Sequence, residues 1–124
     1  MKTHNPLFLA QALLAKSRIT EIDIHQAKKR LESANPPVLI DVREDSEWQT
    51  GHLPNAIHLS KGIIERDIEK TIPDIHTPLI LYCSGGYRSA IATEQLQKMG
   101  YTNVCSMDGG TSAWINAGYP IQKP

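Results

Sequence analysis

Cys83 is the residue best placed to carry chemistry, because it stands between a buried strand and the start of a helix. The apolar run Leu79–Tyr82 predicts the strand, and a helical pattern begins at Ser89. The first turn of a helix has unpaired N–H groups and a positive dipole end, which favour an anion such as a thiolate. We therefore predict a nucleophilic cysteine here rather than a small buried apolar residue.

The residues after Cys83 add further groups that bind negative charge. Two glycines allow the backbone to bend, so that several N–H groups can point at one centre. Arg88 contributes a permanent cation with a planar fork of donors. The predicted anion-binding loop consists of Ser84, Gly85, Gly86, Tyr87, Arg88 and Ser89.

Strand and helix patterns alternate along the 124-residue chain, which predicts an α/β fold with a parallel sheet between two layers of helices. Apolar runs predict strands at residues 38–42, 57–59, 79–82 and 104–107, and helical spacing predicts helices at residues 60–72, 89–99 and 111–117. Ligands of such sheets bind beyond the carboxyl ends of the strands. We expect Cys83, Arg43 and Asp108 to line one crevice there.

Two further helices are predicted near the N-terminus. Thr20 is expected to cap one of them, with Asp23 as the acid of a capping box. The other spans residues 1–17, and we expect a retained amphipathic helix rather than an export signal, packed on the domain in preference to mediating self-association. Its predicted packing face is Leu7, Ala10, Leu13 and Leu14. The expected organisation is thus an N-terminal helical extension, residues 1–17, and one domain, residues 18–124.

Composition narrows the classes of partner. Lysine and arginine number 13, as do aspartate and glutamate, so the zero net charge favours neither nucleic acid nor an anionic membrane as the main partner. No apolar run reaches the length of a membrane span. Two cysteines are too few for a disulfide framework, so we expect a cytoplasmic location. His25 and His76 lack the spacing of zinc ligands, and no metal site is expected.

Three sequence blocks, taken together, resemble the rhodanese (thiosulfate sulfurtransferase) family over about residues 20–122. The second block carries the pattern Cys-x-x-Gly-x-Arg-Ser around Cys83. The blocks are Ile40–Arg43 with Glu47 and residues 51–56, then residues 82–89, then residues 107–110 with Ala113, Trp114 and residues 117–120. The resemblance implies a single-domain member with the rhodanese-like three-layer fold, whose central sheet is mostly parallel and to which the N-terminal helix is an addition.

The resemblance also implies a reaction. Cys83 would take the outer sulfur of thiosulfate, or of a similar small sulfur-containing anion, as a persulfide and pass it to cyanide, a thiol or a protein acceptor. Arg88 would bind the anionic end of the donor, and the N–H groups of the loop would stabilise the persulfide. The family's reaction needs no metal or organic cofactor.

Three charged residues are expected to support the loop rather than to react. Asp41 interrupts an apolar strand, so it needs a partner, and Arg43 is the expected one. Glu47 is expected to hold Arg88. Cys105 is predicted to be a strand residue, with a role in resolving the persulfide as the less favoured alternative.

Two alternatives to sulfur transfer remain open. Related phosphatases and arsenate reductases also combine a cysteine, main-chain N–H groups and an arginine, but in a Cys-x5-Arg loop one residue longer than Cys83–Arg88. A tetrahedral oxyanion needs a wider cradle than a single sulfur atom does, so the short loop favours sulfur. A non-catalytic regulatory or docking module of the same fold is the second alternative, and the presence of both Cys83 and Arg88 counts against it.

Overall fold

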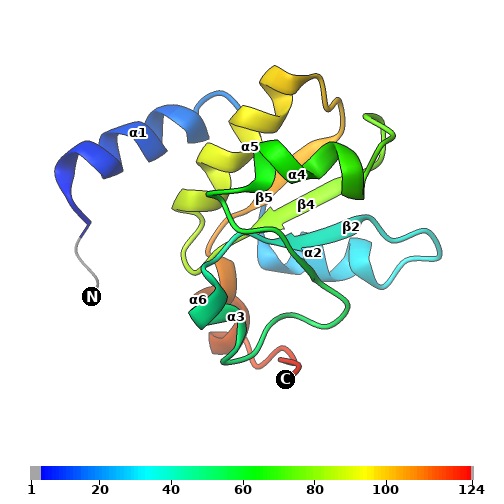
Figure 1. The fold of residues 1–124 in the computed structure, drawn as a ribbon. Helices are drawn as coiled ribbons and strands as arrows, with labels where there is room; N and C mark the ends of the chain where they lie inside the picture. Colours follow the sequence, from blue (N-terminus) through cyan, green and yellow to red (C-terminus); the bar gives the residue numbers. More distant parts are fainter. Residues whose placement is uncertain (1–3, 124) are drawn as a thin grey trace.

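A five-stranded parallel sheet forms the centre of the computed structural model, which describes residues 4–123 (Figure 1). The strands lie in the order β1–β5–β4–β2–β3, and all four neighbouring pairs are parallel. Their bounds are Thr20–Ile22 (β1), Val38–Asp41 (β2), Ile57–His58 (β3), Leu79–Tyr82 (β4) and Val104–Met107 (β5). The predicted parallel sheet is confirmed, and β4, which ends at the residue before Cys83, is its central strand.

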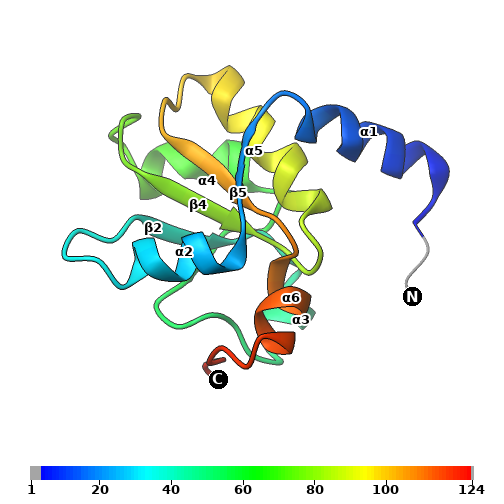
Figure 2. The same ribbon diagram turned by 180° about the vertical axis from the view of Figure 1, so that it is seen from behind.

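Helices cover both faces of the sheet (Figures 1 and 2). Helices α4 (Ile64–Thr71) and α5 (Tyr87–Met99) pack on one face, and α2 (Ile24–Leu31) and α6 (Gly110–Asn116) pack on the other. Helix α3 (Asp45–Trp48) is a single turn after β2. Helix α1 (Pro6–Lys16) lies outside these layers, against α5. The predicted three-layer fold is confirmed, and no helix within residues 4–123 is long and apolar enough to cross a membrane.

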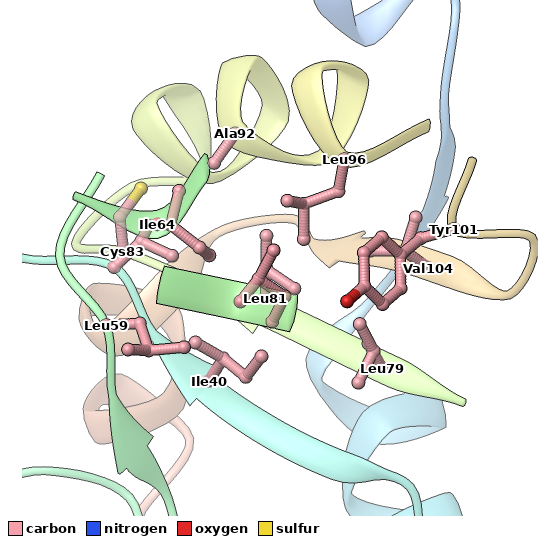
Figure 3. Close-up of a cluster of buried hydrophobic side chains, with 12 residues drawn as sticks. Ile40, Leu59, Ile64, Leu79, Leu81, Cys83, Ala92, Leu96, Tyr101 and Val104 are labelled. Atoms are coloured by element: carbon pink, nitrogen blue, oxygen red, sulfur yellow. The ribbon is translucent and has the colours of Figure 1, made fainter. Parts of the chain in front are cut away.

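The central strand is buried on both faces because its side chains alternate between two apolar clusters. Leu79 and Leu81 point to the cluster beneath α4 and α5 (Figure 3), whereas Ile80 and Tyr82 point to the cluster beneath α2 and α6. All four side chains are buried. The loop that begins at Cys83 therefore leaves a strand that is fixed from both sides.

The segment predicted to start a helix at Thr20 is instead an edge strand. Thr20 pairs with Cys105 and Ile22 pairs with Met107. The cap of α2 is Asp23, whose carboxylate accepts the N–H of Gln26 at 2.8 Å, while the Gln26 side chain accepts the N–H of Asp23 at 2.9 Å. The prediction was wrong because three residues are too few to show the alternation of a strand.

Helix α1 packs on α5, but through a different face from the predicted one. Its inner face consists of Phe8, Ala12 and Ala15, which pack with Ala90 and Ile91 of α5. The predicted packing face is exposed: Leu7, Ala10, Leu13 and Leu14. Both faces have apolar residues at spacings of three, four and seven, so periodicity alone did not distinguish them, and the smaller side chains allow the two helices to approach. Residues 1–3 of the predicted helix lie outside the described part of the chain.

Candidate active site

The sulfur atom of Cys83 faces the main-chain N–H groups of the loop that follows it. Gly86 donates to Sγ at 3.2 Å and Ser89 donates to it at 3.4 Å. Helix α5 begins at Tyr87, two residues earlier than predicted, so Arg88 and Ser89 belong to its first turn and Sγ lies at its positive end. The cysteine is only 1% exposed, yet Figure 3 shows it at one end of the apolar cluster, with its sulfur directed away from Leu59 and Ile40.

A pair of buried serine hydroxyls continues the contacts of the sulfur. Ser89 Oγ lies 3.5 Å from Cys83 Sγ and 2.8 Å from the hydroxyl of Ser106, on β5. Neither serine is exposed to solvent. Ser89 thus donates its N–H to the sulfur and accepts from it at its hydroxyl oxygen, and the hydrogen bond to Ser106 holds that hydroxyl in place. Sequence reasoning missed Ser106 because nothing distinguishes it from other residues of a strand.

Arg88 forms a two-point ion pair with Glu47 of α3. Arg88 Nη1 donates to Oε1 at 2.6 Å, and Nη2 donates to Oε2 at 3.0 Å. The Ser84 hydroxyl joins the pair, since it accepts from Arg88 Nη2 and donates to Glu47 Oε2, both at 3.1 Å. These hydrogen bonds lower the pKa of Glu47 to about 2, although partial burial opposes the shift. Glu47 is thereby kept ionised and Arg88 is held in place.

Asp41 and Arg43 form a second ion pair, which is buried. The guanidinium donates to Asp41 Oδ2 at 2.8 Å and to the carbonyl of Gly51 at 2.7 Å. Tyr82 donates its hydroxyl to the same carboxylate at 2.7 Å and accepts the N–H of Leu53 at 3.1 Å. This network ties the segment after β2 to the central strand and so supports α3, which carries Glu47.

The start of α6 holds Cys83 and Ser84 by their carbonyl groups. Thr111 donates its N–H to the carbonyl of Cys83 at 2.9 Å, and Ser112 donates to that of Ser84 at 3.0 Å. Gly110 allows this approach: its φ is +54°, and a Cβ atom there would lie 2.3 Å from the Cys83 carbonyl oxygen. The Gly-Gly pair of the third sequence block therefore positions the cysteine.

A cavity of about 600 Å³ opens at Cys83. Its lining residues are His4, Phe8, Glu47, Cys83, Ser84, Gly85, Tyr87, Arg88 and Ser112. The expectation that Arg43 and Asp108 line it with Cys83 was wrong, because Arg43 turns inward to Asp41 and lines a separate hollow, while Asp108 pairs with Lys16 at 2.9 Å. Sequence reasoning missed His4 and Phe8, since both lie before the segment that carries the three sequence blocks.

The second cysteine lies on the other face of the sheet. Cys105 belongs to the cluster beneath α2 and α6, whereas Cys83 belongs to the cluster beneath α4 and α5. Burial raises the pKa of the Cys105 thiol, although the Arg30 guanidinium lies 3.6 Å from its sulfur. Within residues 4–123, no group of three His, Cys, Asp or Glu side chains is arranged as metal ligands would be.

The fold and the site together define a class of cysteine-loop protein. Its members have an α/β fold with a parallel sheet, and a cysteine at the carboxyl end of the central strand faces main-chain N–H groups and an arginine. Residues 23–117 match the family described as Rhodanese-like domain, and the chain belongs to this family. The resemblance found in the three sequence blocks is thus confirmed.

Comparison with known proteins finds curated relatives and solved structures, three of which are informative for this site. The chain is 31% identical to the thiosulfate sulfurtransferase GlpE of Vibrio cholerae over 101 residues, which cover 82% of this chain and 92% of the relative. A polysulfide-sulfur transferase homodimer of Wolinella succinogenes has a TM-score of 0.80 and 28% identity, covering 95% of this chain and 88% of that one. A protein of unknown function from Rhodopseudomonas palustris, described as a possible tyrosine phosphatase, has a TM-score of 0.74 and 25% identity, covering 98% of each chain. Membership of a family with sulfurtransferase relatives supports a transferase.

Proposed function

We propose that this protein transfers sulfane sulfur through a persulfide on Cys83, with thiosulfate or a similar compound as donor. The observation that carries the proposal is the position of Cys83 Sγ, 3.2 Å from the nitrogen of Gly86 and 3.4 Å from that of Ser89 at the start of α5. Two N–H groups aimed at Sγ stabilise the thiolate of Cys83, which attacks the donor and which is the leaving group when the acceptor takes the sulfur.

In the first half-reaction the Cys83 thiolate attacks the outer sulfur of thiosulfate. The sulfur–sulfur bond of the donor breaks, and sulfite leaves with the bonding electron pair. The negative charge of the new persulfide rests on its outer sulfur, which projects into the cavity. Arg88 uses three of its five N–H donors within the described residues, so two remain for the oxygens of the donor or of sulfite.

In the second half-reaction an acceptor attacks the outer sulfur of the persulfide. Cyanide would leave as thiocyanate, and a thiol, free or on a partner protein, would leave as its own persulfide. The Cys83 thiolate is the leaving group, and the N–H groups of Gly86 and Ser89 stabilise it as it forms. The cysteine is regenerated without any net change in oxidation state.

Phosphate-ester hydrolysis is the second candidate, because the possible tyrosine phosphatase from Rhodopseudomonas palustris shares the fold over almost the whole chain. The arginine argues against it. Bidentate binding of a phosphoryl group needs two parallel N–H donors of a guanidinium. Nη2 of Arg88 uses both of its N–H groups on Glu47 and Ser84, so the two N–H groups that remain, on Nε and Nη1, do not form a parallel pair.

The test compares wild type with Cys83→Ser and, as the matched control, Cys105→Ala. After treatment with thiosulfate or polysulfide, intact-mass spectrometry should detect one added sulfur atom on wild type and on Cys105→Ala, but none on Cys83→Ser. Cyanide should then remove it as thiocyanate. Absence of the adduct with every sulfane donor would overturn the proposal in favour of a docking module, and release of phosphate from an aryl phosphate without thiocyanate formation would overturn it in favour of a phosphatase.

A further inference from the structure

The cavity at Cys83 has two chemically different walls. Glu47, Arg88 and Ser84 form the polar wall, whereas His4, Phe8 and Tyr87 form an aromatic one. The His4 ring lies edge-on to Tyr87, with centroids 4.6 Å apart, and tilted to Phe8, with centroids 5.7 Å apart. The three rings therefore form one continuous surface beside the reactive sulfur.

The aromatic wall is held in place by the packing of α1. Ala12 and Ala15, on the same side of the helix as Phe8, are buried against α5. At the end of the helix, Lys16 pairs with Glu21 at 2.5 Å and with Asp108 at 2.9 Å, and its ammonium lies 5.4 Å from the centre of the Tyr87 ring. The side of α1 that packs on the domain is thus the side that brings Phe8 to the cavity.

The polar wall carries little net charge. The Arg88 cation is paired with the Glu47 carboxylate through both oxygens, so their charges offset each other. A dianion such as thiosulfate would bind next to both this pair and the Cys83 thiolate. The nearly neutral pair would contribute little electrostatic binding energy to offset the repulsion between the dianion and the thiolate. A donor with one negative charge and an apolar group loses less to repulsion and can also bury that group against the rings.

The size of the cavity fits such a donor. Its volume of about 600 Å³ falls within the range of roughly 300–1,000 Å³ that is typical of sites for organic ligands. Thiosulfate, with five atoms, would leave most of that space to solvent.

We propose that the wall of His4, Phe8 and Tyr87 binds the organic group of a sulfane-sulfur donor and makes the protein selective for aromatic thiosulfonates. This inference rests on the proposed sulfur transfer through Cys83. The thiolate attacks the terminal sulfur of R–SO₂–S⁻, the sulfur–sulfur bond breaks, and the sulfinate R–SO₂⁻ leaves with the electron pair. Two negative charges are present before the step and two after it, and no oxidant or reductant is needed.

The test measures kcat/KM for three donors at a fixed concentration of cyanide: benzenethiosulfonate, methanethiosulfonate and thiosulfate. In a ping-pong reaction this constant reports only the half-reaction of the donor. Methanethiosulfonate has the charge of the aromatic donor without its ring, so it separates the contribution of the ring from that of charge. The variants are Phe8→Ala, Phe8→Leu and, as a matched control on the same helix, Leu7→Ala, because Leu7 is 87% exposed.

We expect Phe8→Ala to lower kcat/KM for benzenethiosulfonate by about 3- to 10-fold, because the variant loses an aromatic contact with the ring of the donor. The kcat/KM values for methanethiosulfonate and thiosulfate should change by less than about twofold. Phe8→Leu should give a smaller loss, and Leu7→Ala should match wild type. Unchanged turnover of methanethiosulfonate would itself show that the variant is folded. An equal change for all three donors, or none for the aromatic one, would overturn the inference and leave sulfur transfer standing. Absence of a Cys83 adduct in wild type with every donor would overturn both.

Discussion

Glu47 holds Arg88 by both carboxylate oxygens, at 2.6 and 3.0 Å, so the cation in the wall of the Cys83 cavity is positioned and partly neutralised by the same contact. Positioning favours the anionic donor, because Arg88 then presents its remaining N–H groups in a fixed direction. Neutralisation opposes the binding of that donor, because an anion bound there lies close to the Glu47 carboxylate as well as to the Arg88 guanidinium. The two effects can be separated by a change that removes the charge and retains the shape.

Glu47→Gln is expected to lower the KM for thiosulfate by about threefold, since one negative charge beside a dianion is removed and the amide oxygen can still accept from Arg88. The kcat should change little. Steady-state kinetics at low and high ionic strength provide the measurement, and the gain should shrink in salt. A KM that rises tenfold would contradict this, and would mean that Glu47 acts mainly by positioning Arg88.

The same ion pair should make stability depend on pH in the acid range. The pKa of Glu47 is lowered from 4.5 to about 2 by Arg88, so its contribution is present above about pH 4.5 and is lost as pH falls towards 2. At neutral pH we expect Glu47→Gln to lower the free energy of unfolding by about 1 kcal/mol, because the pair is only half-buried.

Urea unfolding of wild type and Glu47→Gln across this pH range checks the prediction, and the difference between them should disappear near pH 2. Glu32→Gln is the control, since Glu32 forms an exposed pair with Lys28 and should change stability by less than about 0.5 kcal/mol. A difference between wild type and Glu47→Gln that stays constant down to pH 2 would show that the ionised carboxylate is not its source.

Gly110→Ala is expected to lower sulfur transfer by about a hundredfold, because its Cβ would lie 2.3 Å from the Cys83 carbonyl oxygen and displace the loop. Gly118→Ala is the control: its φ of +79° is also left-handed, but no atom lies within 4 Å of the added Cβ. That variant should lose about 1 kcal/mol of stability and keep its turnover. Thiocyanate formation and urea unfolding measure both effects, and wild-type turnover by Gly110→Ala would contradict the role given to α6.

Much of the fold could be predicted because its strands are buried on both faces. Leu79–Tyr82 and Val104–Met107 are continuous apolar or small-residue runs, and their predicted bounds are those of the structure. The edge strand Thr20–Ile22 could not be predicted, because only its pairing with β5 identifies it as a strand.

The residues of the site also fall into those that could be predicted from the sequence and those that could not. The loop around Cys83 could be predicted, since its residue types are contiguous and each has a physical reason to be there. Of the aromatic wall, only Tyr87 belongs to that predicted loop. Phe8 could not be predicted, because it reaches the cavity only through the packing of α1 on α5, and the sequence offers a more apolar face of that helix. Residues that act through tertiary packing leave little trace in local sequence.

Asp41→Asn is expected to lower the free energy of unfolding by about 3–5 kcal/mol, because it leaves the Arg43 charge buried without a counter-ion. Asp41 is fully buried and also accepts the hydroxyl of Tyr82, so the amide would lose charge-assisted hydrogen bonds that water cannot replace. Asp45→Asn is the matched control. The Asp45 side chain is 86% exposed, and the change should cost less than about 0.5 kcal/mol.

The double variant Asp41→Asn with Arg43→Met separates the loss of the pair from the burial of an unpaired charge. Because it removes both charges, its cost should be well below the sum of the two single variants. Urea unfolding of all four proteins completes the cycle. Additive costs would contradict the prediction, because they would mean that Asp41 and Arg43 stabilise the protein independently and that the pair does not hold the segment from β2 to α3 as a unit.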